Sequence, residues 1–202
     1  MKVLYVGQYS DGTTSKMRCK VIQKILKPSI FQVIDTHIPF YKTHRLLRSF
    51  GFRYKKGPLI NNINKYIIAA LKEKAYDLIW VDKAVFITPK TTKLLKQKTS
   101  KLVHSTPDMA FYANKSKLFY ASLPLYDFCI TTKTIEIKIY YKYLLKSRVL
   151  FMPQGFSKEI HTPHHSFSQK EDAIVFIGLA EPSRFKVAEI ILANNLRLKI
   201  VG

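Results

Sequence analysis

The sequence predicts an α/β protein built on a doubly wound parallel β-sheet. Short apolar runs typical of strands alternate with longer segments whose apolar residues recur at helical spacing. Residues 77–82 form a continuous apolar run between two acids, as in a strand covered on both faces. Because strand and helix alternate throughout, parallel strands joined by crossover helices are expected.

The first elements are a strand, a helix and a strand. Residues 2–6 are a short apolar run that ends at Gly7. The turn cluster at residues 10–15 is typical of a helix start, and Pro28 ends the helix. Residues 30–34 form the second strand. The apolar positions of the helix are Met17, Val21, Ile22, Ile25 and Leu26.

The middle of the chain begins with a polar, aromatic and basic segment, residues 37–56. Leu46, Leu47 and Phe50 predict a short helix within it. Residues 61–75 carry apolar side chains on one helical face. The next strand is 77–82, and Pro89 is typical of the first position of the helix that follows. The remaining elements are expected at residues 101–105 (strand), 116–122 (helix), 127–131 (strand), 134–143 (helix) and 148–152 (strand).

A change in composition and apolar periodicity predicts a domain boundary. Residues 157–172 are polar, with three histidines and no apolar period, and are interpreted as a linker. The strand-helix-strand pattern then restarts at 173–177, 182–194 and 197–201. We therefore expect a first domain over residues 1–156, a linker over 157–172, and the start of a truncated second domain over 173–202.

Composition excludes several classes of protein. The 202 residues carry 34 Lys and Arg against 13 Asp and Glu, a formal net charge of +21. With 47% hydrophobic residues the chain is too apolar for a disordered basic tail. No signal-peptide pattern or membrane-length apolar run is visible, so a cytoplasmic protein is expected, with peripheral contact at the inner face of the membrane. Cys19 and Cys129 are expected to be buried and reduced.

The charge itself leaves four explanations open. They are nucleic acid, an anionic membrane surface, an anionic small substrate such as a nucleotide-sugar or lipid pyrophosphate, and a lysine-rich coding composition. Nucleic acid is the least expected, because the basic residues are scattered and no nucleic-acid-binding motif accompanies them. Composition explains the lysines but not the scarcity of acids. The functional interpretation is faster encounter with an anionic partner.

Three segments at expected strand ends are candidate sites. In the first, Ser10, Gly12, Thr13 and Thr14 belong to the loop before the first helix, whose free N–H groups suit a phosphate. Asp11 lies in the same loop and is a candidate base. The loop is neither a dinucleotide fingerprint nor a P-loop. The alternative is an ordinary turn with Asp11 or Thr14 as the helix N-cap.

The second and third segments follow later strands. Lys83, after Asp82, is a candidate contact for an anionic substrate, and the alternative is an ion pair at the strand end. A phospho-acceptor role for Asp82 is rejected, because the acid pair that such a site needs is missing after the first strand. His104 and Asp108 are candidates for general-base catalysis, with Thr106 as a substrate contact. The alternative is a histidine at the edge of the core and an acid in a turn.

Other polar clusters are weaker candidates. The three linker histidines, His161, His164 and His165, lack the rigid partners that a metal site needs, so no metal is expected. His37 and His44 are expected to be solvated. Two stretches rich in aromatic residues and lysine, 50–56 and 140–146, suit a membrane or polysaccharide, although helical cores with extended lysines explain them equally well.

The order of these motifs resembles a GT-B glycosyltransferase, in particular the spore-maturation type related to the group 1 and group 4 enzymes. The similar stretches are Lys2–Gly7, the strand ending Trp80-Val81-Asp82-Lys83, His104-Ser105-Thr106-Pro107-Asp108 and Asp127-Phe128-Cys129-Ile130-Thr131-Thr132. Phe151-Met152-Pro153-Gln154-Gly155-Phe156, followed by His161 and Pro163, resembles the hinge after the N-terminal domain, with Gln154 in place of Asn. Ile174-Val175-Phe176-Ile177-Gly178 resembles the first strand of the C-terminal domain.

The resemblance implies two facing Rossmann-like domains, with the acceptor held mainly by the first and the nucleotide-sugar donor mainly by the second. It implies transfer of a sugar to a cell-surface glycan or lipid-linked acceptor, with no cofactor besides the donor substrate and no required metal. Gln154 and Gly155 become candidate substrate contacts at the hinge. The rival hypothesis is a non-catalytic basic module that binds polysaccharide, anionic lipid or nucleic acid.

Overall fold

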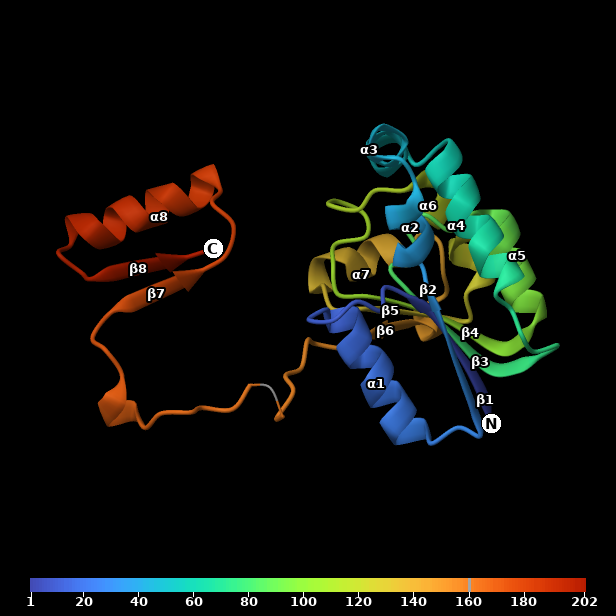
Figure 1. The fold of residues 1–202 in the computed structure, drawn as a ribbon, viewed down its shortest axis with the longest axis horizontal. Coiled ribbons are helices and arrows are strands. Elements are labelled where there is room, and N and C mark those ends of the chain that lie inside the picture. The colour runs from blue at the N-terminus through green and yellow to red at the C-terminus, as the bar shows by residue number, and fades with distance from the viewer. Residues whose placement is uncertain (160) are drawn as a thin grey trace. The chain divides into compact units, whose positions relative to one another are not determined.

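Six parallel strands form the central sheet, in the order β2-β1-β3-β4-β5-β6 (Figure 1). This computed structural model describes residues 1–159 and 161–202. The chain divides into two units, residues 1–154 and 155–202, and the sheet belongs to the first. The predicted α/β fold with a parallel sheet is confirmed.

The strands pair in a register that brings their carboxyl ends to one edge of the sheet. Val6 lies opposite Val81, Asp82 opposite Ser105, and Thr106 opposite Thr131. The sequence prediction places these strands within one or two residues of their observed bounds. The bounds are β1 (Lys2–Gly7), β2 (Ile30–Asp35), β3 (Tyr76–Asp82), β4 (Thr99–Thr106), β5 (Phe128–Thr131) and β6 (Val149–Phe151).

Helices connect the strands, and three of them differ from the prediction. The helix expected at 61–75 begins at Pro58 and ends at Ala69, and the one expected at 134–143 ends at Tyr140. A helix that the pattern does not predict covers His37–Lys42. The helices of the first unit are α1 (Thr14–Leu26), α2 (His37–Lys42), α3 (Arg45–Tyr54), α4 (Pro58–Ala69), α5 (Pro89–Gln97), α6 (Lys117–Ser122) and α7 (Thr134–Tyr140), with 3₁₀ turns at Leu123–Leu125 and Lys146–Arg148.

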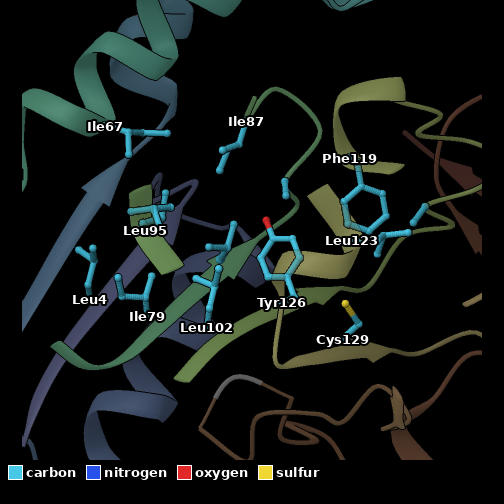
Figure 2. Packing of buried hydrophobic residues seen from close by; sticks show 14 of the residues in the cluster. Leu4, Ile67, Ile79, Ile87, Leu95, Leu102, Phe119, Leu123, Tyr126 and Cys129 are labelled. Carbon is cyan, nitrogen blue, oxygen red and sulfur yellow. The ribbon is translucent and has the colours of Figure 1, made fainter. Parts of the chain in front are cut away.

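The larger core lies between the sheet and helices α4 to α7. Figure 2 shows Leu4, Ile79 and Leu102 on neighbouring strands pointing toward the helical residues Ile67 and Leu95. All five side chains are fully buried. Burial of apolar surface on this scale is the main favourable contribution to folding.

Helix α1 covers the other face of the sheet (Figure 1). Tyr5, which points away from Leu4 because side chains alternate along a strand, donates its hydroxyl to the Ser15 carbonyl at 2.9 Å. Of the five positions predicted to form the apolar face of α1, Val21 and Ile25 are exposed. The helix is fixed instead by small buried residues, Ser15 and Cys19.

The second unit contains β7 (Ile174–Ile177), α8 (Pro182–Ala193) and β8 (Leu198–Val201), preceded by a 3₁₀ turn at Phe167–Gln169. The two strands form a small parallel sheet. Apolar side chains on all three elements are exposed, as at Ile177, Ile190 and Ile200. The predicted linker includes residue 160, which lies outside the described residues.

No helix in the described ranges is both long and apolar enough to cross a membrane.

Candidate functional site

The candidate site lies where neighbouring strands β1 and β3 send the chain to opposite faces of the sheet. The chain leaves β1 for α1 on one face, and leaves β3 for α5 on the other. In open α/β sheets, ligands bind beyond the carboxyl ends of the strands at such a switch point. Gly7 and Asp82 end the two strands. A Cβ on Gly7 would lie 2.8 Å from the Asp82 Cβ, so only glycine allows this approach.

A buried ion pair joins α1 to the end of β3. Arg18 Nη1 lies 2.6 Å from Asp82 Oδ1, and the Asp82 side chain is 0% exposed. Burial raises the pKa of the Asp82 carboxyl above its usual value, although the charge of Arg18 acts to lower it. The other oxygen, Oδ2, has no hydrogen-bond partner within the described ranges. Asp82 is therefore a structural anchor for the start of α1 rather than a solvent-facing acid.

The loop between β1 and α1 forms a capped turn at this edge. Thr13 is the N-cap, and its hydroxyl accepts the Lys16 N–H at 3.3 Å, so the predicted caps Asp11 and Thr14 are wrong. The Thr13 hydroxyl and N–H donate to the Ser10 carbonyl at 2.7 and 3.4 Å. Gly12 and Thr14 are exposed. The loop therefore remains open to solvent.

Asp11 is a poor general base in this arrangement. Its side chain is 94% exposed and pairs with Lys16 at 2.6 Å. The hydrogen bond from Lys16, helped by the lysine charge, lowers the pKa of the Asp11 carboxyl. A carboxylate held ionised in this way has a reduced tendency to take a proton.

Lys83 and Asp108 meet across the carboxyl ends of β3 and β4. The Lys83 Nζ lies 2.8 Å from Asp108 Oδ2, and the two side chains are 34% and 42% exposed. The ion-pair alternative for Lys83 is therefore present, with Asp108 as the partner. Lys83 has a φ of 54°, in the left-handed region that residues with side chains rarely adopt, and such strain gathers at functional sites.

Hydrogen bonds to buried side chains fix the loop that carries Asp108. Glu136 of α7 is fully buried and accepts the N–H groups of Ala110 at 3.0 Å and Phe111 at 2.7 Å. The Thr106 hydroxyl accepts the Asp108 N–H at 3.1 Å. Thr106 is itself buried, so its hydroxyl supports the loop and faces no solvent.

His104 belongs to the core and not to the site. Its side chain is 1% exposed and its ring lies 4.5 Å from that of Phe119 and 5.4 Å from that of Tyr126. Burial lowers the pKa of His104 to about 3. We correct the expectation of a catalytic His104, because a substrate cannot reach this ring in the structure.

Sequence reasoning missed the part of the edge formed by β2. Asp35 Oδ1 accepts the N–H of Tyr9 at 3.1 Å and of His37 at 2.9 Å. His37, expected to be solvated, is half-buried against Phe40, and burial lowers its pKa. Asp35 directly follows the apolar run of the second strand, and this position was the available signal.

Arg18 was also missed, although its spacing carries a signal. It precedes Ile22 by four residues, so it shares the side of the helix on which that apolar residue lies.

Two further candidates, Gln154 and Gly155, belong to the predicted hinge. Gln154 and Gly155 are exposed, and they fall on either side of the boundary between the two units. A substrate contact at Gln154 or Gly155 therefore remains a prediction.

Within residues 1–159 and 161–202, no group of three or more His, Cys, Asp or Glu side chains could hold a metal ion. The prediction that Cys19 and Cys129 are buried free thiols is confirmed. Burial, with a smaller effect of Asp82, raises the pKa of Cys19 to about 12, which makes the thiolate inaccessible.

Fold and site together define a Rossmann-like α/β protein with a polar, ion-paired carboxyl edge at its switch point. Comparison of the chain with protein-family models finds no matching family, and comparison with curated proteins finds no relative.

Proposed function

We propose that the first unit of the chain is the acceptor-side domain of a GT-B-type glycosyltransferase, and that the second unit belongs to its donor-binding side. The observation that supports this most directly is the half-exposed Lys83–Asp108 pair beside the switch point. The ordered motifs of the sequence add to it.

In the proposed reaction Asp108 is the general base. Its carboxylate accepts the proton of an acceptor hydroxyl, while the hydroxyl oxygen forms a bond to the anomeric carbon of the donor sugar. The bond from that carbon to the nucleotide phosphate breaks, and its electron pair leaves with the nucleoside diphosphate. A phosphate of the donor takes Lys83 from Asp108 in this reaction, so the carboxylate is no longer ion-paired when it accepts the proton. The solvent-exposed 10–14 loop at the start of α1 suits phosphate oxygens.

The test is an assay of the protein with a panel of nucleotide-sugars and glycan or lipid-linked acceptors. Asp108→Asn should lower transfer by about a hundred-fold or more, while donor binding is retained or tightened because the neutral amide competes less for Lys83. Asp77→Asn is the matched control, because Asp77 is exposed near the start of β3, at the other end of that strand from Lys83, and it should keep most of the activity. Absence of both binding and turnover across the panel would overturn the proposal.

The second candidate is a non-catalytic basic module for polysaccharide, anionic lipid or nucleic acid. The net charge of +21 favours it. It predicts binding that weakens steeply with salt and is insensitive to Asp108→Asn.

A further inference from the structure

Helix α3 presents an exposed apolar stripe on the surface of the first unit. Leu46, Leu47, Phe50 and Tyr54 recur at helical spacing and lie on one side of the helix. Their exposed fractions run from 44% at Leu47 to 73% at Leu46. We call these four residues the α3 stripe. A contiguous apolar patch on a protein surface usually marks a place where something docks.

Other residues of α3 already pack against the first unit, so the α3 stripe is not needed for packing within that unit. Gly51 is buried against α4, where an added Cβ would lie 2.5 Å from the Leu59 Cβ. The Phe52 ring lies 5.8 Å from that of Phe86. Figure 1 shows α3 at the margin of the first unit, beside α2 and α4.

Basic side chains flank the stripe, and acids are missing from the surrounding sequence. Arg45, Arg53 and Lys56 are exposed beside or just after the stripe. Between Asp35 and Glu73 the sequence has eight Lys and Arg and no acid. A short helix with apolar side chains on one face and basic residues beside them is the pattern that lies in the surface of an anionic bilayer.

We propose that α3 docks the protein on an anionic phospholipid membrane. The leucines and Phe50 of the α3 stripe enter the boundary between headgroups and acyl chains. Tyr54 lies at the membrane–water interface, and Arg45 and Arg53 bind lipid phosphates. A second copy of the chain is a poorer occupant, since pairing this surface with itself would bring like charges together. Nucleic acid would pair with the arginines but would leave the leucines in water.

Docking through α3 also fixes which end of the strands lies on the same side as the membrane-binding helix. Helix α2 begins two residues after Asp35, at the carboxyl end of β2, and α3 follows it directly. The carboxyl edge that holds the Lys83–Asp108 pair therefore belongs to the same end of the strands as the docking helix. Docking requires no chemistry at that edge, so vesicle binding and sugar transfer fail or succeed separately.

Co-sedimentation with vesicles tests the apolar part of the proposal. The full chain should bind vesicles of equal parts phosphatidylcholine and phosphatidylglycerol, and should not bind pure phosphatidylcholine. Leu46→Ser with Phe50→Ser should weaken binding on the order of a hundred-fold without changing charge. Ile135→Ser with Leu145→Ser, at sites 62% and 72% exposed, is the matched control and should bind normally.

Charge reversal tests the electrostatic part. Arg45→Glu with Arg53→Glu should weaken binding at least about twenty-fold, and high salt should do the same to the parent chain. Lys20→Glu with Lys93→Glu makes the same change of charge at exposed positions on α1 and α5 and should have a much smaller effect. Equal losses in the two pairs would show a diffuse effect of net charge and would overturn docking through α3.

A fluorescence measurement reports insertion directly. The chain has one tryptophan, Trp80, so Leu46→Trp adds a second emitter at the stripe. Its additional emission should shift to shorter wavelength with the anionic vesicles. No shift, equal binding to neutral vesicles, or self-association that the Leu46→Ser and Phe50→Ser changes abolish would each overturn the proposal. Circular dichroism of every variant shows whether the fold is retained.

Discussion

Removing the arginine of the Arg18–Asp82 pair should destabilise the first unit strongly. Arg18→Met preserves much of the side chain's length and apolar stem but leaves the Asp82 carboxyl without its cation. Breaking a buried pair from one side costs about 3–5 kcal/mol. Because Arg18 is 23% exposed and water reaches it, we expect the lower end, about 3 kcal/mol. That is a large part of the about 5–15 kcal/mol that holds a typical domain folded.

The effect should also depend on pH. Burial already raises the pKa of Asp82 in the folded state, and loss of the arginine removes an influence that lowers it. Between the unfolded value of about 3.9 and the raised folded pKa, the folded state then binds more protons than the unfolded state. Stability therefore falls as pH rises, by up to about 1.4 kcal/mol per pH unit, until Asp82 ionises in the folded state. The deficit of the variant should be larger at pH 8 than at pH 5.

Urea unfolding followed by tryptophan fluorescence measures this deficit. Trp80 lies on β3 and is the single tryptophan of the chain, so it reports the first unit alone. Adding Asp82→Asn to Arg18→Met removes the titrating group and should restore part of the stability at pH 8. Arg53→Met is the control and should change stability by less than about 0.5 kcal/mol. A deficit that small for Arg18→Met, with no pH dependence, would refute the reasoning.

Three further predictions use the same unfolding assay. Gly7→Ala should cost about 1–3 kcal/mol, because the new Cβ meets the Asp82 Cβ, and unchanged stability would show that the strand ends can separate. His104→Leu should flatten the pH dependence: the folded pKa of about 3 lies below the unfolded value of about 6.5, so the parent loses up to about 1.4 kcal/mol per unit as pH falls between them, and an equal slope in the variant would contradict this. Glu136→Gln should cost about 2 kcal/mol, because an amide cannot accept both buried N–H groups, and a neutral result would mean that another group accepts them.

The strands were predicted well because their signal is local. A parallel strand covered on both faces must be apolar along its length, so β1 and β3 stand out in the sequence. Helix α2 was missed because it is only six residues long and contains Pro39. The end of α4 was placed too late because residues 70–75 favour a helix by composition. In the fold the helix ends at Ala69, and the Glu73 N–H bonds to the Tyr76 hydroxyl at 3.2 Å.

The site was predicted less well than the strands, because its contacts join residues that are distant in the sequence. Lys83 and Asp108 could each be singled out as charged residues at strand ends, but their pairing depends on the register of β3 and β4. Arg18 and Asp82 are 64 residues apart. His104 looked reactive by its neighbours in sequence, and only the packing of Phe119 and Tyr126 shows that it is sealed in the core.

The Lys83–Asp108 contact also carries a consequence for the order in which ligands bind. In the unliganded chain the two charges satisfy each other, so an anion that takes the lysine has to displace the carboxylate. A neutral hydroxyl that approaches Asp108 competes only weakly with the charged Lys83 for the carboxylate. Once an anion holds Lys83, the carboxylate becomes free to accept a proton. Binding of the anionic ligand to Lys83 would therefore be the step that frees the proposed base, Asp108. Kinetics would show this as a compulsory order in which the anionic ligand binds first.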